Sequence, residues 1–233
     1  MANELARYQT ESGEIVITQE DIATVLCPNQ PVTVKEVRMF VELCKAQGLN
    51  PFIKEAYLIK YGDNPATIVT GKGVFTKRAA RNPRYRGHEA GITFIGTDGG
   101  LHRREGTLLL QGECLVGGWC RVHVEGYDCP IFDEVSLSEY STGKSNWKKM
   151  PATMIRKVAL VHALREAFPE DFQGLYDSAE MGDAVPENNE PYAEQGFEPV
   201  AEIPVYEQLA EQPAEASAVT VQQIYREPVT GTF

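Results

Sequence analysis

The stretch from Pro151 to Phe168, PATMIRKVALVHALREAF, decides the fold of this chain. It predicts a helix, because proline suits the first turn and apolar residues recur over most of the circumference. A helix that is apolar almost all round belongs in the interior of a domain, between other elements. We therefore expect this helix to lie at the centre of the core.

Two cations interrupt the apolar surface of this helix. Lys157 and Arg165 are eight residues apart on one face, which places them about 12 Å apart along the axis. Charges that lie among apolar side chains need a partner. That partner is either a carboxylate, for which the sequence offers Glu166 and Glu170, or an external anion. We favour the anion, because the phosphates of a nucleic acid backbone are regularly spaced.

The elements on the N-terminal side of this helix follow from local signals. Thr33 and Glu36 form a capping-box pattern at the start of a helix that Gly48 ends. Two strands at 55–61 and 66–70, joined by a turn at 62–65, precede a short helix at 71–81. Three or four strands are predicted between Gly91 and Val135, separated by turn residues at 97–100, 117–118 and 125–126.

Composition divides the chain into three parts. Residues 1–32 are predicted to be a polar N-terminal arm, 33–182 the core, and 183–233 an acidic tail. The tail contains ten acidic residues and one basic residue, and it therefore contributes −9 of the formal net charge of −11. Its composition cannot bury enough apolar surface to offset the entropy of ordering, so we expect it to be largely disordered.

The basic residues of the core lie in two blocks. Residues 72–104 and residues 144–165 each have a net charge of +6, although the core as a whole is nearly neutral. Two such blocks predict a groove for a polyanion, whereas either block alone would also fit a solvated face. Trp147, directly before Lys148 and Lys149, is a candidate for stacking on bases or for packing at the groove, whereas Phe75 is more simply a core residue.

Several classes of protein are excluded by the composition. No stretch approaches 18 consecutive apolar residues, and the first residues lack the apolar region of a signal peptide. We therefore expect neither a membrane span nor secretion. Five cysteines with no close pair do not form a disulfide framework, which fits a reducing cytoplasm.

Motifs for nucleotide or zinc chemistry are incomplete. Residues 138–145 end in Gly-Lys-Ser, but Ser138 stands where a phosphate-binding loop needs its first glycine, so we expect any activity to be independent of ATP. Zinc would need four ligands, and their alternation in a predicted strand favours buried thiols instead. The candidates for that site are Cys114, Cys120, His123 and Cys129. We expect no cofactor and leave an effect of Mg²⁺ open.

Two alternative functions remain open on the residues alone. One is a metal-dependent nuclease that uses the adjacent carboxylates Glu170 and Asp171, or Asp133 and Glu134. No nuclease-type pattern accompanies either pair. The other alternative is a structural assembly protein, whose basic blocks would meet acidic blocks of neighbouring subunits.

A series of short segments carries a family resemblance. They are GLNPFIKE at 48–55, ATIVTGKGVFTKR at 66–78, Asn82-Pro83, LVGGW at 115–119, WKKMP at 147–151, MIRKVAL at 154–160 and ALREAFP at 163–169. In this order, over roughly residues 33–181, the chain resembles the phage Bet family of Red-beta and RecT-like single-strand annealing proteins. One such segment would be a weak signal, but this many in collinear order are highly specific.

The resemblance implies a fold and an activity. The fold is α+β, with a twisted antiparallel sheet packed with helices, distantly like the Rad52 annealing core. The activity is ATP-independent annealing of complementary single-stranded DNA in phage recombination, by a ring or helical homo-oligomer that binds single strands and the annealed duplex. Such a protein is not an enzyme, and it acts in the cytoplasm of a bacterial host that carries the phage or prophage.

The resemblance also implies where DNA binds. The positions at which the family contacts DNA are Lys54, Trp147, Arg156, Lys157 and Arg165. The basic blocks of this sequence add Lys72, Lys77, Arg78, Lys148 and Lys149.

The C-terminal region departs from the family pattern. Red-beta-like proteins continue into a folded helical domain that docks a partner 5′→3′ exonuclease and the host single-strand-binding protein. Here the region is short, acidic and interrupted by proline, and only Val219–Tyr225 is suited to a brief docking segment. Those partners stay possible, but no contact residues can be transferred.

Overall fold

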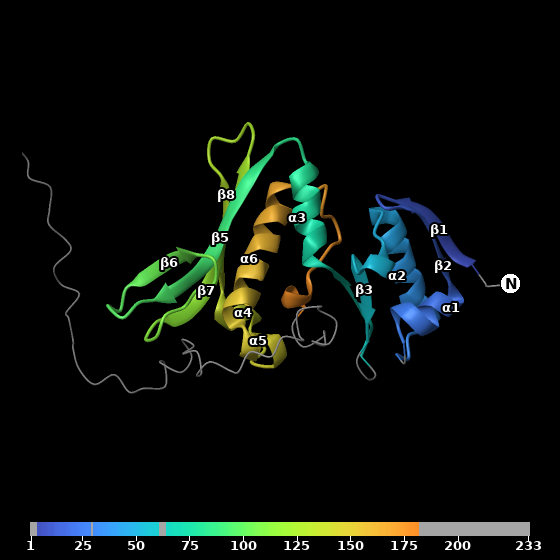
Figure 1. The fold of residues 1–233 in the computed structure, drawn as a ribbon, viewed down its shortest axis with the longest axis horizontal. Helices are drawn as coiled ribbons and strands as arrows, with labels where there is room; N and C mark the ends of the chain where they lie inside the picture. The colour runs from blue at the N-terminus through green and yellow to red at the C-terminus, as the bar shows by residue number, and fades with distance from the viewer. Residues whose placement is uncertain (1–3, 29, 61–63, 182–233) are drawn as a thin grey trace, which may run out of the picture.

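A four-stranded antiparallel sheet forms one layer of the core. The computed structural model describes residues 4–28, 30–60 and 64–181 (Figure 1). The strands of the sheet run in the order β6-β5-β7-β8. They are β5 (Tyr85–Ile95), β6 (Leu101–Glu105), β7 (Cys114–Val124) and β8 (Ile131–Ser136). The α+β class with an antiparallel sheet is confirmed, whereas the predicted tail at 183–233 and the docking segment at Val219–Tyr225 lie outside the described residues.

Helix α6 (Pro151–Ala167) is the predicted central helix. It packs on β7 and β8, and Figure 1 shows it between the sheet and helix α3 (Lys72–Arg81). Residues 157–161 are all buried, and five consecutive residues cover the whole circumference of a helix. The interior position that the apolar pattern predicts is therefore confirmed.

Glycine allows α6 to approach the sheet closely. A Cβ atom at Gly118 would lie 2.5 Å from the carbonyl oxygen of Ile155 in α6, and one at Gly117 would lie 2.4 Å from the carbonyl oxygen of Val135. The prediction that these glycines separate two strands is wrong, because both lie inside β7. They provide room for neighbouring backbones rather than a turn.

The N-terminal region forms a hairpin, although the sequence analysis assigned it no strand. Strands β1 (Glu4–Thr10) and β2 (Gly13–Thr18) pair antiparallel, and a three-residue helix α1 (Gln19–Asp21) and a π-helix η1 (Ile22–Leu26) follow. Tyr8 and Ile17 are buried in the core. The Tyr8 hydroxyl donates a hydrogen bond to the carbonyl oxygen of Leu49, at 2.9 Å, which ties the hairpin to the end of helix α2 (Val34–Gln47).

The helices and strands that short sequence motifs predicted between Thr33 and Arg81 are confirmed. Helix α2 (Val34–Gln47) begins at the reciprocal capping box of Thr33 and Glu36, and it ends at Gly48 in the left-handed conformation. A 3-10 turn η2 (Pro51–Ile53) leads to the hairpin of β3 (Ala56–Ile59) and β4 (Thr67–Thr70), and then to α3.

Short elements complete the C-terminal half. Helices α4 (Leu137–Tyr140) and α5 (Ser145–Lys149) connect β8 to α6. Residues 175–181, here named the C-terminal strap, contain the 3-10 turn η3 (Ser178–Glu180). The strap pairs with the end of β4, where the amide of Thr70 donates to the carbonyl oxygen of Tyr176 at 2.8 Å. Within the described part of the chain, no helix is both long and apolar enough to span a bilayer.

Candidate nucleic-acid interface

The fold brings α3 and α6, which carry one cation each from the two basic blocks, into contact with β5 (Tyr85–Ile95), the strand of His88. Lys72 begins α3, Arg156 lies on α6, and both are half-buried. Burial lowers the pKa of His88, and the positive charges of Arg156 and Lys72 lower it further. The Arg156 Nε donates to the carbonyl oxygen of Ala90, at 3.0 Å, which holds its guanidinium against the sheet. One cation from each block therefore acts on the same region of the surface.

Lys157, the first cation of the α6 row, is paired inside the chain. Its side chain is 8% exposed, and its Nζ lies 3.0 Å from the Asp177 Oδ1, whose side chain is fully buried. The same Nζ donates to the Ser178 Oγ at 3.2 Å. Burial raises the pKa of Asp177, whereas the charge of Lys157 opposes that shift.

Arg165, the second cation of the row, is also paired with the strap. It forms an ion pair with Glu180, donates to the carbonyl oxygen of Leu175 at 3.1 Å, and stacks over the ring of Tyr176. The sequence favoured an external anion over a carboxylate for this row, whereas the described residues pair both cations with carboxylates. They come from the C-terminal strap, and not from Glu166 or Glu170.

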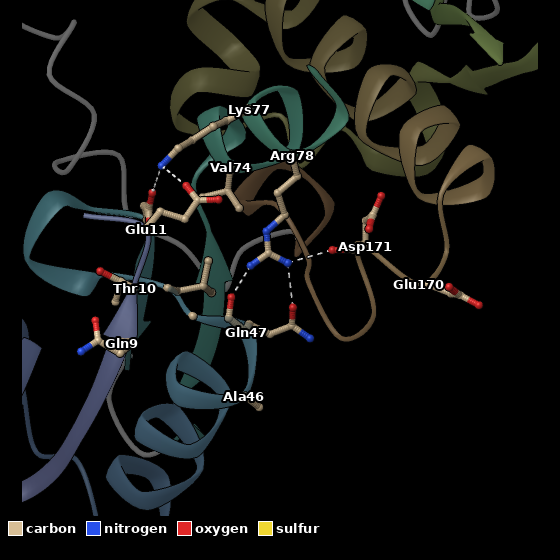
Figure 2. A pocket seen from close by; sticks show the side chains of 13 residues that line it. Gln9, Thr10, Glu11, Ala46, Gln47, Val74, Lys77, Arg78, Glu170 and Asp171 are labelled. Carbon is tan, nitrogen blue, oxygen red and sulfur yellow. Dashed lines mark hydrogen bonds and ion pairs between the residues drawn. The ribbon is translucent and has the colours of Figure 1, made fainter. Parts of the chain in front are cut away.

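Lys77 and Arg78 line a cleft of about 450 Å³. Figure 2 shows its walls, formed by the β1–β2 hairpin, the end of α2, helix α3 and residues 170–171. The Arg78 Nη1 donates to the Gln47 Oε1 at 2.7 Å and to the carbonyl oxygen of Asp171 at 2.8 Å. Burial lowers the pKa of Arg78. These contacts fix Arg78 as a link between α2, α3 and the segment after α6.

Lys77 is the more accessible of the two cleft cations. Its Nζ lies 2.8 Å from the Glu55 Oε1 and 2.6 Å from the Glu11 Oε2 (Figure 2). Arg81, one helical turn further along α3, also pairs with Glu11. Sequence reasoning placed Arg81 in a basic block without singling it out, and it did not identify Glu11. No local signal pairs an acid in the N-terminal hairpin with a helix that follows about 60 residues later.

The remaining predicted contacts differ in exposure. Lys54, Lys148 and Lys149 are exposed, and Lys54 ends η2 in the left-handed conformation, next to the partly exposed Phe52 and Ile53. Trp147 is 5% exposed, so its ring faces the core and is not presented to a base in this conformation. The role of Trp147 in DNA binding stays a prediction, in which its ring supports the surface residues from beneath. Phe75 is fully buried, as expected of a core residue.

The adjacent acids of the nuclease alternative point in different directions. Asp133 pairs with His162, at 3.3 Å, and Glu134 pairs with Arg103 and accepts a bond from Thr93. Neighbouring residues of a strand face opposite sides of a sheet, so these two carboxylates do not converge.

The second pair of acids and the zinc candidates are likewise dispersed. Asp171 accepts a bond from the Asn82 Nδ2, at 2.7 Å. Cys114 and Cys120 are buried, as the strand pattern favoured, whereas Cys129 is exposed and His123 pairs with Glu89. Among the described residues, no group of three or more His, Cys, Asp or Glu side chains is placed to hold a metal ion.

Comparison with known proteins identifies the family. The model of the RecT family matches residues 12–193, most of the chain. This chain belongs to the RecT family. An uncharacterized protein of Ureaplasma parvum serovar 3 is 33% identical over 159 residues, which covers 66% of this chain and 66% of that protein. The chain thus spans slightly less than two thirds of that relative's length. Membership of the RecT family confirms the assignment that the ordered segments predicted.

Proposed function

We propose that this RecT-family protein anneals complementary single strands of DNA without ATP, in phage recombination. It would act as a ring or helical homo-oligomer in the cytoplasm of a bacterial host. Family membership supports the activity, and one observation of the structure supports its location. Lys72 and Arg156, which come from the two basic blocks, lie on helices that both contact β5, the strand of His88, so a single surface would be able to follow a phosphate backbone.

The proposed contacts fall into two groups. One group would contact phosphates directly: Lys54, Lys72, Lys77, Lys148, Lys149 and Arg156. The other group is buried or joins a helix to the segment after α6, and it would shape the groove from beneath: Arg78, Trp147, Lys157 and Arg165.

The mechanism follows from the contacts to the backbone. Lys and Arg that neutralise phosphates reduce the repulsion between two strands, and they leave base edges free to test their pairing. We propose no cofactor for this step. A partner 5′→3′ exonuclease and the host single-strand-binding protein remain proposed partners, and no contact residues are assigned to them.

The test is an annealing assay with two complementary oligonucleotides that carry a fluorescent donor and an acceptor. The protein should accelerate annealing without ATP, both with Mg²⁺ and with a chelator. No acceleration in either condition would refute the proposed function.

A pair of matched variants locates the site. Lys72→Gln with Arg156→Gln should weaken single-strand binding and lower the slope of log affinity against log salt by about 1.4, the value for two phosphates. Lys35→Gln with Arg38→Gln removes two exposed charges from α2 and should leave the slope unchanged. Circular dichroism checks that both variants fold. Equal losses in the two variants would show that the site lies elsewhere.

A further inference from the structure

Glu11 occupies a place that suits a phosphate. It lies at the turn between β1 and β2, and both of its carboxylate oxygens are engaged by helix α3. Its Oε2 lies 2.6 Å from the Lys77 Nζ, and its Oε1 pairs with Arg81. Two cations that converge on the two oxygens of one carboxylate form an anion site, because a phosphate presents the same pair of acceptors.

Helix geometry keeps this anion site in place when its occupant changes. Lys77 and Arg81 are four residues apart in α3, and they therefore lie on one face, about 6 Å apart along the axis. Glu55 holds Lys77 independently of Glu11, at 2.8 Å, and is itself fixed by the backbone amide of Asn50 at 2.9 Å. Departure of Glu11 would leave Lys77 positioned and only partly neutralised.

The contact with Glu11 is also exchangeable. The side chains of Glu11, Lys77 and Arg81 are 40%, 37% and 53% exposed, and exposed ion pairs contribute little net stability. The pair of Lys157 and Asp177 is the opposite case, because both side chains are buried and water cannot replace a partner that is removed. Release of Glu11 requires only rotation of its side chain, since the turn backbone is held by the bond from Thr10 to Gly13.

We propose that Lys77 and Arg81 bind a phosphate of single-stranded DNA and that Glu11 occupies this anion site when DNA is absent. Glu11 then competes with DNA for Lys77 and Arg81 and so lowers the affinity for DNA. When DNA dissociates, the carboxylate of Glu11 returns to the two cations. This inference deepens the proposed function and rests on it for the identity of the ligand. The site itself adjoins the cleft of Figure 2, which Glu11 and Lys77 both line.

The test compares two substitutions that remove the same charge from the same hairpin. Glu11→Gln should bind a single-stranded oligothymidine and, separately, tripolyphosphate about three- to ten-fold more tightly than the unmodified protein, the equivalent of up to two exposed ion pairs. Glu14→Gln is the matched control, because Glu14 is similarly exposed but pairs with Arg7 instead. It should change neither affinity. Fluorescence anisotropy reports on DNA and calorimetry on tripolyphosphate.

A second variant ties the gain to the anion site. In an Arg81→Gln background, Glu11→Gln should give a much smaller gain. Equal gains from Glu11→Gln and Glu14→Gln, or an undiminished gain in that background, would overturn the inference. If no variant bound or annealed DNA but tripolyphosphate kept the expected ranking, the proposed function would fail while the anion site stood. If the protein annealed DNA but Glu11→Gln changed the affinity for neither oligothymidine nor tripolyphosphate, the proposed role of Glu11 would be refuted while the proposed function stood.

Discussion

The pair formed by Lys157 and Asp177 gives the sharpest prediction about stability. The substitution Asp177→Asn keeps the shape of the side chain and the oxygen that accepts the amide of Ala179, at 2.9 Å, but it removes the negative charge. The ammonium of Lys157, whose side chain is 8% exposed, then loses the carboxylate of Asp177. Removal of one partner from a buried ion pair costs about 3–5 kcal/mol.

We expect the lower end of that range. The Asp177 Oδ2 has no hydrogen-bond partner among the described residues, and burial already raises the pKa of this carboxyl, so the pair is less favourable than a fully satisfied one. A loss of about 3 kcal/mol lowers the melting temperature of a domain of this size by about 6–12 °C.

A double variant separates pairing from DNA binding. Lys157→Met together with Asp177→Asn removes both charges, and it should recover most of the lost stability because the buried ammonium is removed together with the Asp177 carboxylate. Urea denaturation followed by circular dichroism measures all three proteins, and anisotropy with an oligothymidine measures their binding. A change below about 0.5 kcal/mol for Asp177→Asn would refute the reasoning. A stable double variant that fails to bind DNA would show that Lys157 contacts the ligand directly.

Two further predictions concern pH and packing. Asp133 and Glu180 raise the pKa of His162 to about 9, so its stabilising charge is fully present below its ordinary pKa near 6.5 and is lost as pH rises towards 9. The free energy of urea unfolding should therefore fall by about 2–3 kcal/mol more in the unmodified protein than in His162→Gln between pH 6 and pH 9.5; parallel profiles would contradict this. Gly118→Ala should destabilise by about 1–3 kcal/mol, because its Cβ would meet the carbonyl oxygen of Ile155. Gly73→Ala lies in the first turn of α3, where no atom lies within 4 Å of the added Cβ, and it should instead stabilise by about 0.4–1 kcal/mol; the same sign in both thermal melts would refute the packing argument.

Local signals in the sequence were sufficient where neighbouring residues decide the structure. The capping box of Thr33 and Glu36 and the closing Gly48 involve contacts within a few residues, and they define α2 as predicted. The continuous apolar pattern of α6 was equally informative, because a helix of that composition has only one stable environment, the interior.

Features that depend on distant partners could not be predicted. Gly118 looks like a turn residue because the sequence does not show that Ile155 packs against it. Glu166 seemed a natural partner for Arg165, but adjacent residues of a helix do not face each other. The actual partner, Glu180, lies in a segment that folds back after α6 ends. The charge blocks could be counted from the sequence, whereas the exposure of each cation, which decides what it can bind, required the fold.

The C-terminal strap also determines when the chain can finish folding. Its contacts reach Thr70 on one side and Lys157 and Arg165 on the other, so it joins segments that are far apart along the chain. Residues 1–167 alone contain α6 but not Asp177 and Glu180, so two cations of the central helix would lack the carboxylates of the strap. Completion of the core therefore requires the last few residues of the described part of the chain. A chain truncated before residue 175 would retain α6 but lose the ion pairs of Asp177 with Lys157 and of Glu180 with Arg165.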